Sequence, residues 1–298
     1  MSSRQFTLAD GAKIPALGLG TWQLDGSQGR EAIVHALKCG YRMLDCAFSY
    51  GNQALVAEAI EQSGVSREDL FIVDKLANTW HSAAEQCLDR TLAALKTDTL
   101  DLWLMHWPSP LNHHGNHPKC PTLPDGTVDF ERDWNYVKTW QTMIEIQNRR
   151  PEVKGLGVAN FGIKELEAIS FTGVLPLVNQ VELHPSLNQE KLHKYCKEKG
   201  IQLVAYSPLG STGSALLHDP DLQVIAEKNN ATVAQCLLSW GVAKGWPVIP
   251  RSSSPDRLEQ NLNILELSVE DVDDISRIGK ASPKRYVTAP WHTFEEIV

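Results

Sequence analysis

Four side chains in the first part of the sequence have the types and spacing needed to transfer a proton to a carbonyl group. The stretch YRMLDCAFSYGN, residues 41–52, ends an apolar run on Asp45 and places Tyr50 just before a glycine. Lys75 and His106 end the next two apolar runs. A phenol with a pKa near ~10 is a weak acid at neutral pH, but a nearby ammonium favours the phenolate. We therefore expect Lys75 to lower the pKa of Tyr50.

The other two side chains complete this chemistry. Asp45 would balance the charge of a buried Lys75, because an unpaired buried charge is costly. His106 would donate a hydrogen bond to the carbonyl oxygen, which becomes an alkoxide. Taken alone, each residue is better explained by a structural role than by chemistry. Asp45 could cap a turn, Lys75 could reach solvent, and His106 could be a core histidine. Their common position at strand ends favours chemistry. Without metal ligands or an activated nucleophile beside them, reduction would need a hydride cofactor.

Eight apolar runs alternate with amphipathic helical patterns and predict the elements that must position these side chains. Near-continuous apolar strands separated by helices indicate a parallel sheet covered on its faces, and this number of units fits a closed (β/α)8 TIM barrel forming a single domain over residues 1–298. The strands are predicted at residues 14–20, 41–45, 70–75, 100–106, 153–160, 176–182, 201–207 and 247–251.

The connections carry further signals. Asp10-Gly11 predicts an N-terminal β-hairpin, and Ser82 with Glu85 predicts a capping box at the start of a helix. A long loop at 108–133 follows the fourth strand, and a C-terminal loop is expected over the barrel mouth. The alternative is an open doubly wound sheet, but GLGLGTWQ has Gln23 where the dinucleotide fingerprint needs glycine. Its glycines are better explained by tight strand packing.

Composition limits the possible partners. The chain has 298 residues, a net charge of −8 and no basic block, so no nucleic-acid partner is expected. It has no apolar run of the ~20 residues that a membrane helix needs, and no signal-peptide pattern. Six scattered cysteines without CxxC favour reduced thiols in a cytoplasmic protein. The segment HHGNHPKC, with His113, His114, His117 and Cys120, is preferred as a solvated loop over a metal site.

Polar residues at the later strand ends suit a flat, phosphate-bearing cofactor. Tyr206 could stack on a ring, and Asn160 and Gln180 could bind a carboxamide. The segment VIPRSSSPDRLEQN, residues 248–261, sets Arg251, three hydroxyls and Arg257 around a helix start, which suits a phosphate. An ordinary helix start with charges in solvent explains this segment equally well.

The sequence resembles the aldo-keto reductase family over nearly its whole length, through the hairpin and the motifs GLGTW, YRMLDCAFSYGN, VDK, LMHWP, VANF, NQVELHP, AYSPLGS and IPRSSSPDRLEQN. The resemblance implies that Tyr50 is the general acid, that Asp45 and Lys75 tune it, and that His106 orients the carbonyl. It implies NADPH bound across the barrel mouth, with hydride transfer from the nicotinamide. The residues expected to bind the cofactor are Thr21, Trp22, Asp45, Asn160, Gln180, Tyr206, Ser207, Leu209, Ser211, Arg251, Ser252, Ser253, Arg257, Gln260 and Asn261.

Two positions depart from the family pattern. Ala159 stands where members usually have serine, so one hydrogen bond to the carboxamide is expected to be lost. Arg251 stands where many have lysine, and arginine can still bind a 2′-phosphate.

A small carbonyl compound is the expected substrate, for example an aldose, glyceraldehyde, a sugar acid or a xenobiotic. The wall of its pocket is predicted to combine Tyr50 and His106 with the aromatic residues Trp22, Trp80, Trp107 and Trp291. Two other functions stay open: a Schiff base on Lys75, and a non-catalytic NADPH-binding regulatory protein of the same fold. The family resemblance favours a monomer.

Overall fold

Eight parallel strands form the centre of the molecule in a computed structural model that describes residues 4–211 and 213–294. The order β10-β9-β8-β7-β6-β5-β4-β3 is closed where Leu17 bridges Val248 and the Gly18 N–H donates to the Val248 carbonyl at 2.9 Å. The predicted TIM barrel is confirmed, and the open doubly wound sheet is wrong. The strands are β3 (Leu19–Gly20), β4 (Met43–Asp45), β5 (Phe71–Leu76), β6 (Leu102–Met105), β7 (Leu156–Ala159), β8 (Val178–Glu182), β9 (Gln202–Tyr206) and β10 (Val248–Ile249).

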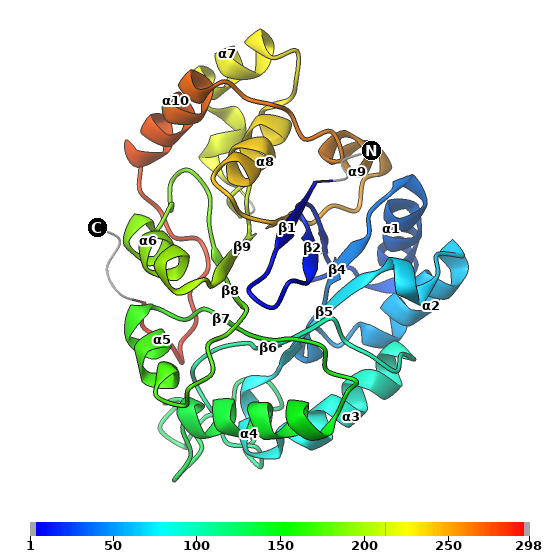
Figure 1. Cartoon of the computed structure of the whole chain (residues 1–298), viewed down its shortest axis with the longest axis vertical. Helices are drawn as coiled ribbons and strands as arrows, with labels where there is room; N and C mark the ends of the chain where they lie inside the picture. Colours follow the sequence, from blue (N-terminus) through cyan, green and yellow to red (C-terminus); the bar gives the residue numbers. More distant parts are fainter. Residues whose placement is uncertain (1–3, 212, 295–298) are drawn as a thin grey trace.

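Helices surround the barrel (Figure 1). Two of them, α7 and α10, were not predicted, because no strand follows either one in the βα alternation. No helix in the described ranges is long and apolar enough to cross a bilayer. The helices are α1 (Gly26–Cys39), α2 (Gln53–Ser63), α3 (Ala84–Leu95), α4 (Tyr136–Arg149), α5 (Ile163–Ser170), α6 (Glu190–Lys199), α7 (Pro220–Lys228), α8 (Val233–Ala243), α9 (Pro255–Asn261) and α10 (Val269–Lys280).

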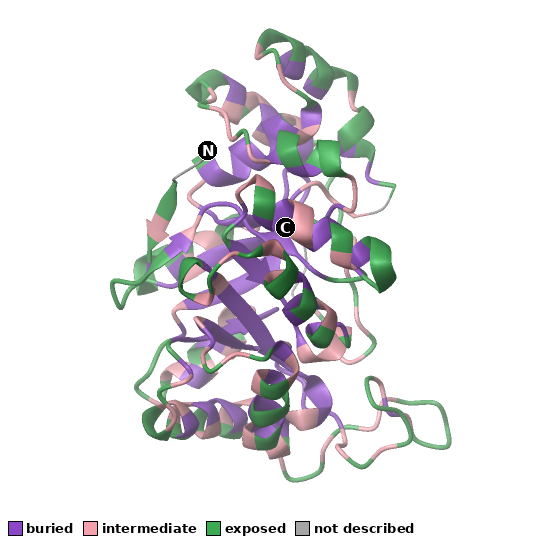
Figure 2. Cartoon of the chain, turned by 90° about the vertical axis from the view of Figure 1, so that its right-hand side faces the viewer, coloured by how far each residue is buried: buried purple, intermediate pink, exposed green. Residues whose placement is uncertain are grey.

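The N-terminal hairpin lies across one end of the barrel (Figure 1). Strands β1 (Gln5–Thr7) and β2 (Lys13–Pro15) pair in antiparallel register, and Gly11 in the turn has a φ of +90°. This confirms the predicted hairpin. Ile14 packs with Met43 and Leu104 in the barrel interior, so the barrel is filled rather than hollow. Figure 2 shows these interior strands as buried. Only the opposite end, where the strands terminate, remains available for a site.

Local packing confirms one sequence interpretation and corrects another. A Cβ atom on Gly18 would come within 2.5 Å of the Met43 side chain, which explains the glycines of the GLGLG motif by tight strand packing. The predicted capping box at Ser82 and Glu85 is wrong. Residues Asn78–Ala83 form a short 3-10 helix, η3, and α3 begins after Ala83 without a side-chain cap.

The two long segments, after β6 and after α10, are held in different ways. The loop after β6 folds on itself through the antiparallel bridges Leu111–Phe130 and Thr122–Val128. The tail after α10 is held by β8, because the backbone N–H groups of Tyr286 and Val287 donate to the Glu182 carboxylate at 2.8 and 2.9 Å.

The substitution Gly279→Ala tests how the tail is set in place. In most helices alanine is more stable than glycine by about 1 kcal/mol. Here a Cβ atom would overlap the backbone carbonyl of Pro185, and overpacking of this kind costs about 1–3 kcal/mol. We therefore expect Gly279→Ala to lower the free energy of unfolding measured with urea. The exposed position Asp273 of the same helix is the control, and Asp273→Ala should change it little. A stabilised Gly279→Ala variant would contradict this packing.

Candidate active site

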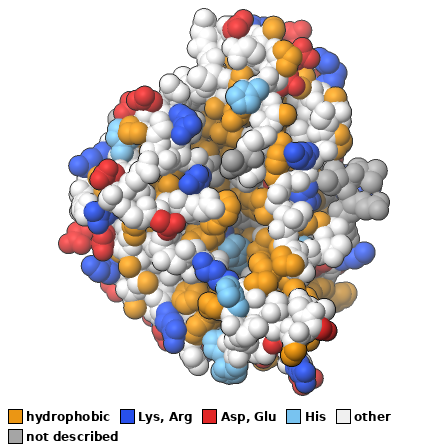
Figure 3. All heavy atoms as spheres, turned by 180° about the vertical axis from the view of Figure 1, so that it is seen from behind, with side chains coloured by type: hydrophobic (Ala, Val, Ile, Leu, Met, Phe, Trp, Pro, Cys, Tyr) orange, Lys and Arg blue, Asp and Glu red, His pale blue; other side chains and the backbone are white. Residues whose placement is uncertain are grey.

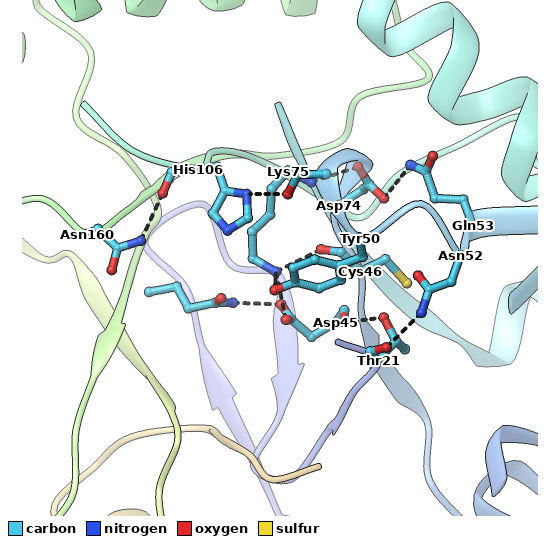
Figure 4. Close-up of polar contacts among 12 residues, drawn as sticks. Thr21, Asp45, Cys46, Tyr50, Asn52, Gln53, Asp74, Lys75, His106 and Asn160 are labelled. Carbon is cyan, nitrogen blue, oxygen red and sulfur yellow. Dashed lines mark hydrogen bonds and ion pairs between the residues drawn. The ribbon is translucent and has the colours of Figure 1, made fainter. Parts of the chain in front are cut away.

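The ends of three neighbouring strands bring the predicted residues together (Figure 4). Asp45 ends β4, Lys75 lies near the end of β5, and His106 follows β6. Tyr50 comes from the 3-10 helix η1 (Phe48–Tyr50), after β4. The Lys75 Nζ atom lies 2.7 Å from Asp45 Oδ2 and 3.4 Å from the Tyr50 hydroxyl. The carboxyl ends of parallel strands therefore gather these four residues into one group.

The ion pair between Lys75 and Asp45 is almost completely buried, with side-chain exposures of 1% and 4%. Lys75 Nζ also donates to the carbonyl oxygen of Cys46 at 2.7 Å, and Gln180 Nε2 donates to Asp45 Oδ1 at 2.7 Å. Burial by itself would lower the pKa of Lys75, but the negative charge of Asp45 and the Tyr50 phenol outweigh burial and raise it. Lys75 is thus held as an ammonium beside the phenol.

The pKa of Tyr50 does not follow the sequence prediction. Burial raises the pKa of this phenol to about 12, although the ammonium of Lys75 acts to lower it. The expectation of a net lowering is therefore wrong for the chain alone, because desolvation of a phenolate outweighs a single cation at 3.4 Å. Tyr50 stays protonated at neutral pH and can act as a proton donor.

His106 is held by its backbone and is neutral. Its N–H donates to the Leu76 carbonyl at 3.2 Å, and its carbonyl accepts from Asn160 Nδ2 at 2.9 Å. Burial lowers the pKa of the ring well below its usual value, and the charge of Lys75 lowers it further. The ring lies edge-on to Tyr50, with ring centroids 5.8 Å apart. A neutral imidazole beside the phenol can donate one hydrogen bond from the ring.

The residues predicted to meet a nicotinamide lie next to this group. The Tyr206 hydroxyl, at the end of β9, donates to Asn160 Oδ1 at 2.8 Å. Asn160 also bonds His106, as described above, and has a left-handed φ of +64°. Gln180 already supports Asp45. The amides are therefore ordered by the protein itself, as a site for a planar ligand requires.

At the end of β10, two guanidiniums lack acidic partners. Arg251 Nη2 donates to the carbonyl of Gln23 at 3.1 Å, and neither Arg251 nor Arg257 forms an ion pair with any carboxylate in the described ranges. Helix α9 has only seven residues, and its own Ser254 caps it by accepting from the Arg257 N–H at 3.5 Å. The two guanidiniums and the nearby hydroxyls, rather than the helix start, are therefore the groups suited to an anion.

The other residues predicted to bind the cofactor lie after β3, after β9, and before or within α9. Thr21 Oγ1 donates to the Asp45 carbonyl at 2.9 Å, and Ser207 and Gly210 have left-handed φ angles of +48° and +74° that turn the segment after β9. Of the other predicted residues, Leu209, Ser211 and Ser253 are half-buried and Gln260 is exposed. Ser252 and Asn261 are buried.

The aromatic side chains predicted for the substrate pocket fall into two groups. The rings of Trp107 and Trp291 are 6.1 Å apart, so the tail reaches the residue after His106. Trp80 instead packs against Phe48 at 5.3 Å. Trp22 is 52% exposed and stands apart from both pairs. Figure 3, which shows the molecule from behind, has hydrophobic side chains gathered around a central hollow. Of the predicted aromatic residues, Trp107 and Trp291 therefore form a pair beside His106, and Trp80 packs against Phe48.

The histidine-rich loop uses two of its rings in local hydrogen bonds. His113 Nδ1 donates to the Thr79 carbonyl at 2.7 Å, because a carbonyl can only accept. His117 Nδ1 accepts from the N–H groups of Lys119 and Cys120 at 3.1 and 3.0 Å. Within the described ranges no group of three His, Cys, Asp or Glu residues could hold a metal ion.

Two polar residues around the site were not predicted. The Asp74 side chain is fully buried behind Lys75, where it accepts from Gln53 Nε2 at 2.8 Å and from the Lys75 N–H at 2.7 Å. The Ser49 hydroxyl lies 3.3 Å from His106 Nδ1. The sequence signals were present but weak: Asp74 is a charge inside an apolar strand, and Ser49 directly precedes Tyr50.

Comparison with known proteins assigns the fold and site to a family. The sequence pattern of the Aldo/keto reductase family matches residues 16–281. The chain belongs to the aldo/keto reductase family.

Glycerol 2-dehydrogenase (NADP(+)) of Saccharomyces cerevisiae is 42% identical, over 99% of this chain and 97% of that protein. D-galacturonate reductase of Hypocrea jecorina is also 42% identical, over 98% and 97%. The aldose reductase of Schistosoma japonicum has the same fold, with a TM-score of 0.89 and 32% identity over 96% of this chain and 94% of that one. As an aldo/keto reductase, the chain is an oxidoreductase of carbonyl groups.

Asp74 predicts a pH dependence of stability in this aldo/keto reductase. Burial raises the pKa of its carboxyl to about 7, against about 3.9 for an unfolded aspartate. Below pH ~4 the group is protonated in both states. As the pH rises towards 7 the unfolded chain releases this proton first, so the folded state loses stability. We expect Asp74→Asn, which cannot ionise, to gain stability relative to the wild type as the pH rises, by up to about 4 kcal/mol at pH 8.

Urea unfolding of both proteins at pH 5 and pH 8 measures this difference. The exposed Asp98 provides the control substitution Asp98→Asn, whose effect should be nearly the same at both pH values. An Asp74→Asn effect that is also independent of pH would mean that Asp74 is ionised in the folded chain throughout this range.

Proposed function

We propose that this chain reduces an aldehyde or ketone to the alcohol with NADPH, and that Tyr50 is the general acid. The observation that carries the proposal is a buried ion pair, Lys75 with Asp45, next to the partly buried side chains of Tyr50 and His106. A phenol that stays protonated lies 3.4 Å from a buried ammonium and edge-on to a neutral imidazole, at the only end of the barrel that the hairpin leaves uncovered. This is the equipment for protonating a carbonyl oxygen.

In the proposed reaction, Tyr50 and His106 both act on the substrate oxygen. The Tyr50 O–H and the His106 ring each donate a hydrogen bond to it, which polarises the carbonyl. When bound, NADPH supplies the hydride to the carbonyl carbon. As negative charge develops on the oxygen, Tyr50 transfers its proton and becomes a phenolate. Lys75 stabilises that phenolate, and Asp45 keeps Lys75 in place, so the proton donor becomes stronger in the transition state than in the resting chain.

The side chains present fit NADPH. The side-chain amides of Asn160 and Gln180 and the ring of Tyr206 suit a nicotinamide. Ala159 has no hydroxyl, so it offers no hydrogen bond at that end. Arg251 and Arg257, without carboxylate partners, suit the 2′-phosphate, with Ser252 and Asn261 beside them. NADP(+) in the name of the yeast relative, glycerol 2-dehydrogenase (NADP(+)), supports the same cofactor.

A small carbonyl compound is the proposed substrate class, and relatives named for glycerol and D-galacturonate support it. The aromatic wall of Trp107 and Trp291 would contact its carbon skeleton. Three further statements stay predictions: residues 1–298 form one domain, the protein is a monomer, and it acts in the cytoplasm.

Tyr50→Phe is the direct test of the general acid. The variant keeps the ring but has no proton to give, so we expect reduction of glyceraldehyde to fall by about 10²–10⁴-fold. Absorbance of NADPH measures turnover, and fluorescence titration should show that NADPH still binds. Phe48→Tyr, at a partly buried position of the same 3-10 helix, controls for general disturbance of this helix. Turnover of Tyr50→Phe close to the wild type would rule out Tyr50 as the acid.

Arg257→Ala tests the phosphate site. Loss of one charge-assisted contact costs about 1.5–3 kcal/mol, so NADPH should bind about 10- to 100-fold more weakly. NADH, which lacks the 2′-phosphate, should be nearly unaffected. Arg30→Ala, which removes a guanidinium already paired with Glu58, should leave both affinities unchanged. Equal weakening of NADPH and NADH by Arg257→Ala would remove the 2′-phosphate from this position.

A further inference from the structure

The ring of His106 has to carry its single proton on a particular nitrogen. A neutral imidazole has one nitrogen that donates and one that accepts. If the proton is on Nε2, this nitrogen can donate to a substrate oxygen. If it is on Nδ1, the Nε2 lone pair would repel that oxygen. The backbone bonds of His106 fix where the residue lies, but they involve neither ring nitrogen.

Ser49 is the residue in contact with one of these nitrogens. Its Oγ atom lies 3.3 Å from His106 Nδ1, and this is the single side-chain hydrogen bond recorded for either group across residues 4–211 and 213–294. Nε2 lies on the other side of the ring and has no hydrogen-bond partner in the same ranges. It is also absent from the buried polar atoms that lack a hydrogen-bond partner, which include ring nitrogens of His81 and His184. Nε2 is therefore open to a ligand.

The distance alone permits two directions for this hydrogen bond, and the hydroxyl proton distinguishes them. If Ser49 donates to Nδ1, its O–H proton and the Nδ1 lone pair are both satisfied. If Nδ1–H donates to Ser49, the O–H proton has no acceptor among the described residues, and an unmade hydrogen bond in a partly buried place is costly. The first arrangement therefore leaves fewer unpaired groups.

We propose that Ser49 is a positioning residue that donates its hydroxyl proton to His106 Nδ1 and thereby holds the imidazole proton on Nε2. This inference rests on the proposed function for its consequence, a donor aimed at the substrate oxygen, but not for the tautomer itself. Ser49 does not touch the substrate in this role. It acts through His106, and it does so from the residue directly before the proton donor Tyr50.

The short helix η1 makes this arrangement precise. The Tyr50 N–H donates to the Ala47 carbonyl at 3.0 Å, and the Gly51 N–H donates to Phe48 at 3.3 Å, with Gly51 at a φ of +76°. One tight turn therefore carries both the acid and the residue that sets the other hydrogen-bond donor. The relative placement of the two donors depends on few rotatable bonds.

The tautomer can be measured directly. Long-range ¹H–¹⁵N correlation spectra of the full chain with ¹⁵N-labelled histidine distinguish a protonated from an unprotonated ring nitrogen, and His106→Gln identifies the signal by its loss. We expect a protonated Nε2 and an unprotonated Nδ1 in the wild type. Ser49→Ala should give a mixture of tautomers, and Ser49→Thr, which keeps the hydroxyl, should restore the wild-type pattern. A wild-type ring protonated on Nδ1, or a tautomer unchanged in Ser49→Ala, would overturn the proposal.

Kinetics then separate positioning from a loss of structure. Removing one neutral hydrogen bond of this kind should lower kcat/KM for glyceraldehyde about three- to tenfold in Ser49→Ala, equally at every pH, with NADPH affinity unchanged and activity recovered in Ser49→Thr. Ser109→Ala is the matched control. Ser109 is buried and follows His106 closely in the sequence, but its hydroxyl makes no hydrogen bond to the His106 ring. A Ser49→Ala profile whose pH dependence shifts would mean that Tyr50 had been disturbed instead, and would contradict the role.

The two measurements also keep this inference apart from the proposed function. A chain with the expected tautomer but no turnover on any carbonyl would remove the proposed reaction and leave the contact of Ser49 intact. A chain that turns over with the wrong tautomer would do the opposite.

Discussion

The buried ion pair between Lys75 and Asp45 is the interaction on which the site depends. Removing two charges from water costs several kcal/mol for each ion, and their attraction repays this only when the remaining polar atoms are also bonded. Here Cys46 and Tyr50 take up further contacts of the ammonium, and Gln180 bonds the second carboxylate oxygen. A buried ion pair of this kind is weak evidence for a gain in the stability of the fold. Its effect is on chemistry, since it fixes a positive charge beside the phenol and helps to keep His106 neutral.

The barrel makes this pair possible because its members come from strands that are neighbours in space. Asp45 and Lys75 lie on β4 and β5, which pair in parallel, and Gln180 lies on β8, several strands away around the barrel. Only a closed sheet lets a side chain from β8 meet one from β4 across the interior. The hairpin and the apolar side chains below it exclude water from the other end of the same interior. Low solvent access and converging strand ends are thus two results of one architecture.

The sequence predicted the fold and the meeting of these polar side chains well, because both follow from periodicity. Polar residues that end apolar strands must meet at one end of a parallel barrel, so Asp45, Lys75 and His106 could be placed together before any distance was known. The direction of the Tyr50 pKa could not be predicted, since it depends on the balance between desolvation and a charge at 3.4 Å. The predicted capping box at Ser82 was wrong for a similar reason. Residues Asn78–Ala83 form a 3-10 helix instead, and Asn78 at its start donates to the Ser109 carbonyl, a contact between distant segments.

Strand β8 connects the proposed catalytic group to the C-terminal tail that is expected to select the substrate. Gln180 and Glu182 are two residues apart, so they point to the same side of the strand. The first supports Asp45, and the second accepts the N–H groups of Tyr286 and Val287. Glu182 therefore holds the tail through its backbone, which is the same whatever side chains the tail carries. Side chains of the tail such as Trp291 can therefore be replaced without removing the anchor at Glu182 or the support that Gln180 gives to Asp45.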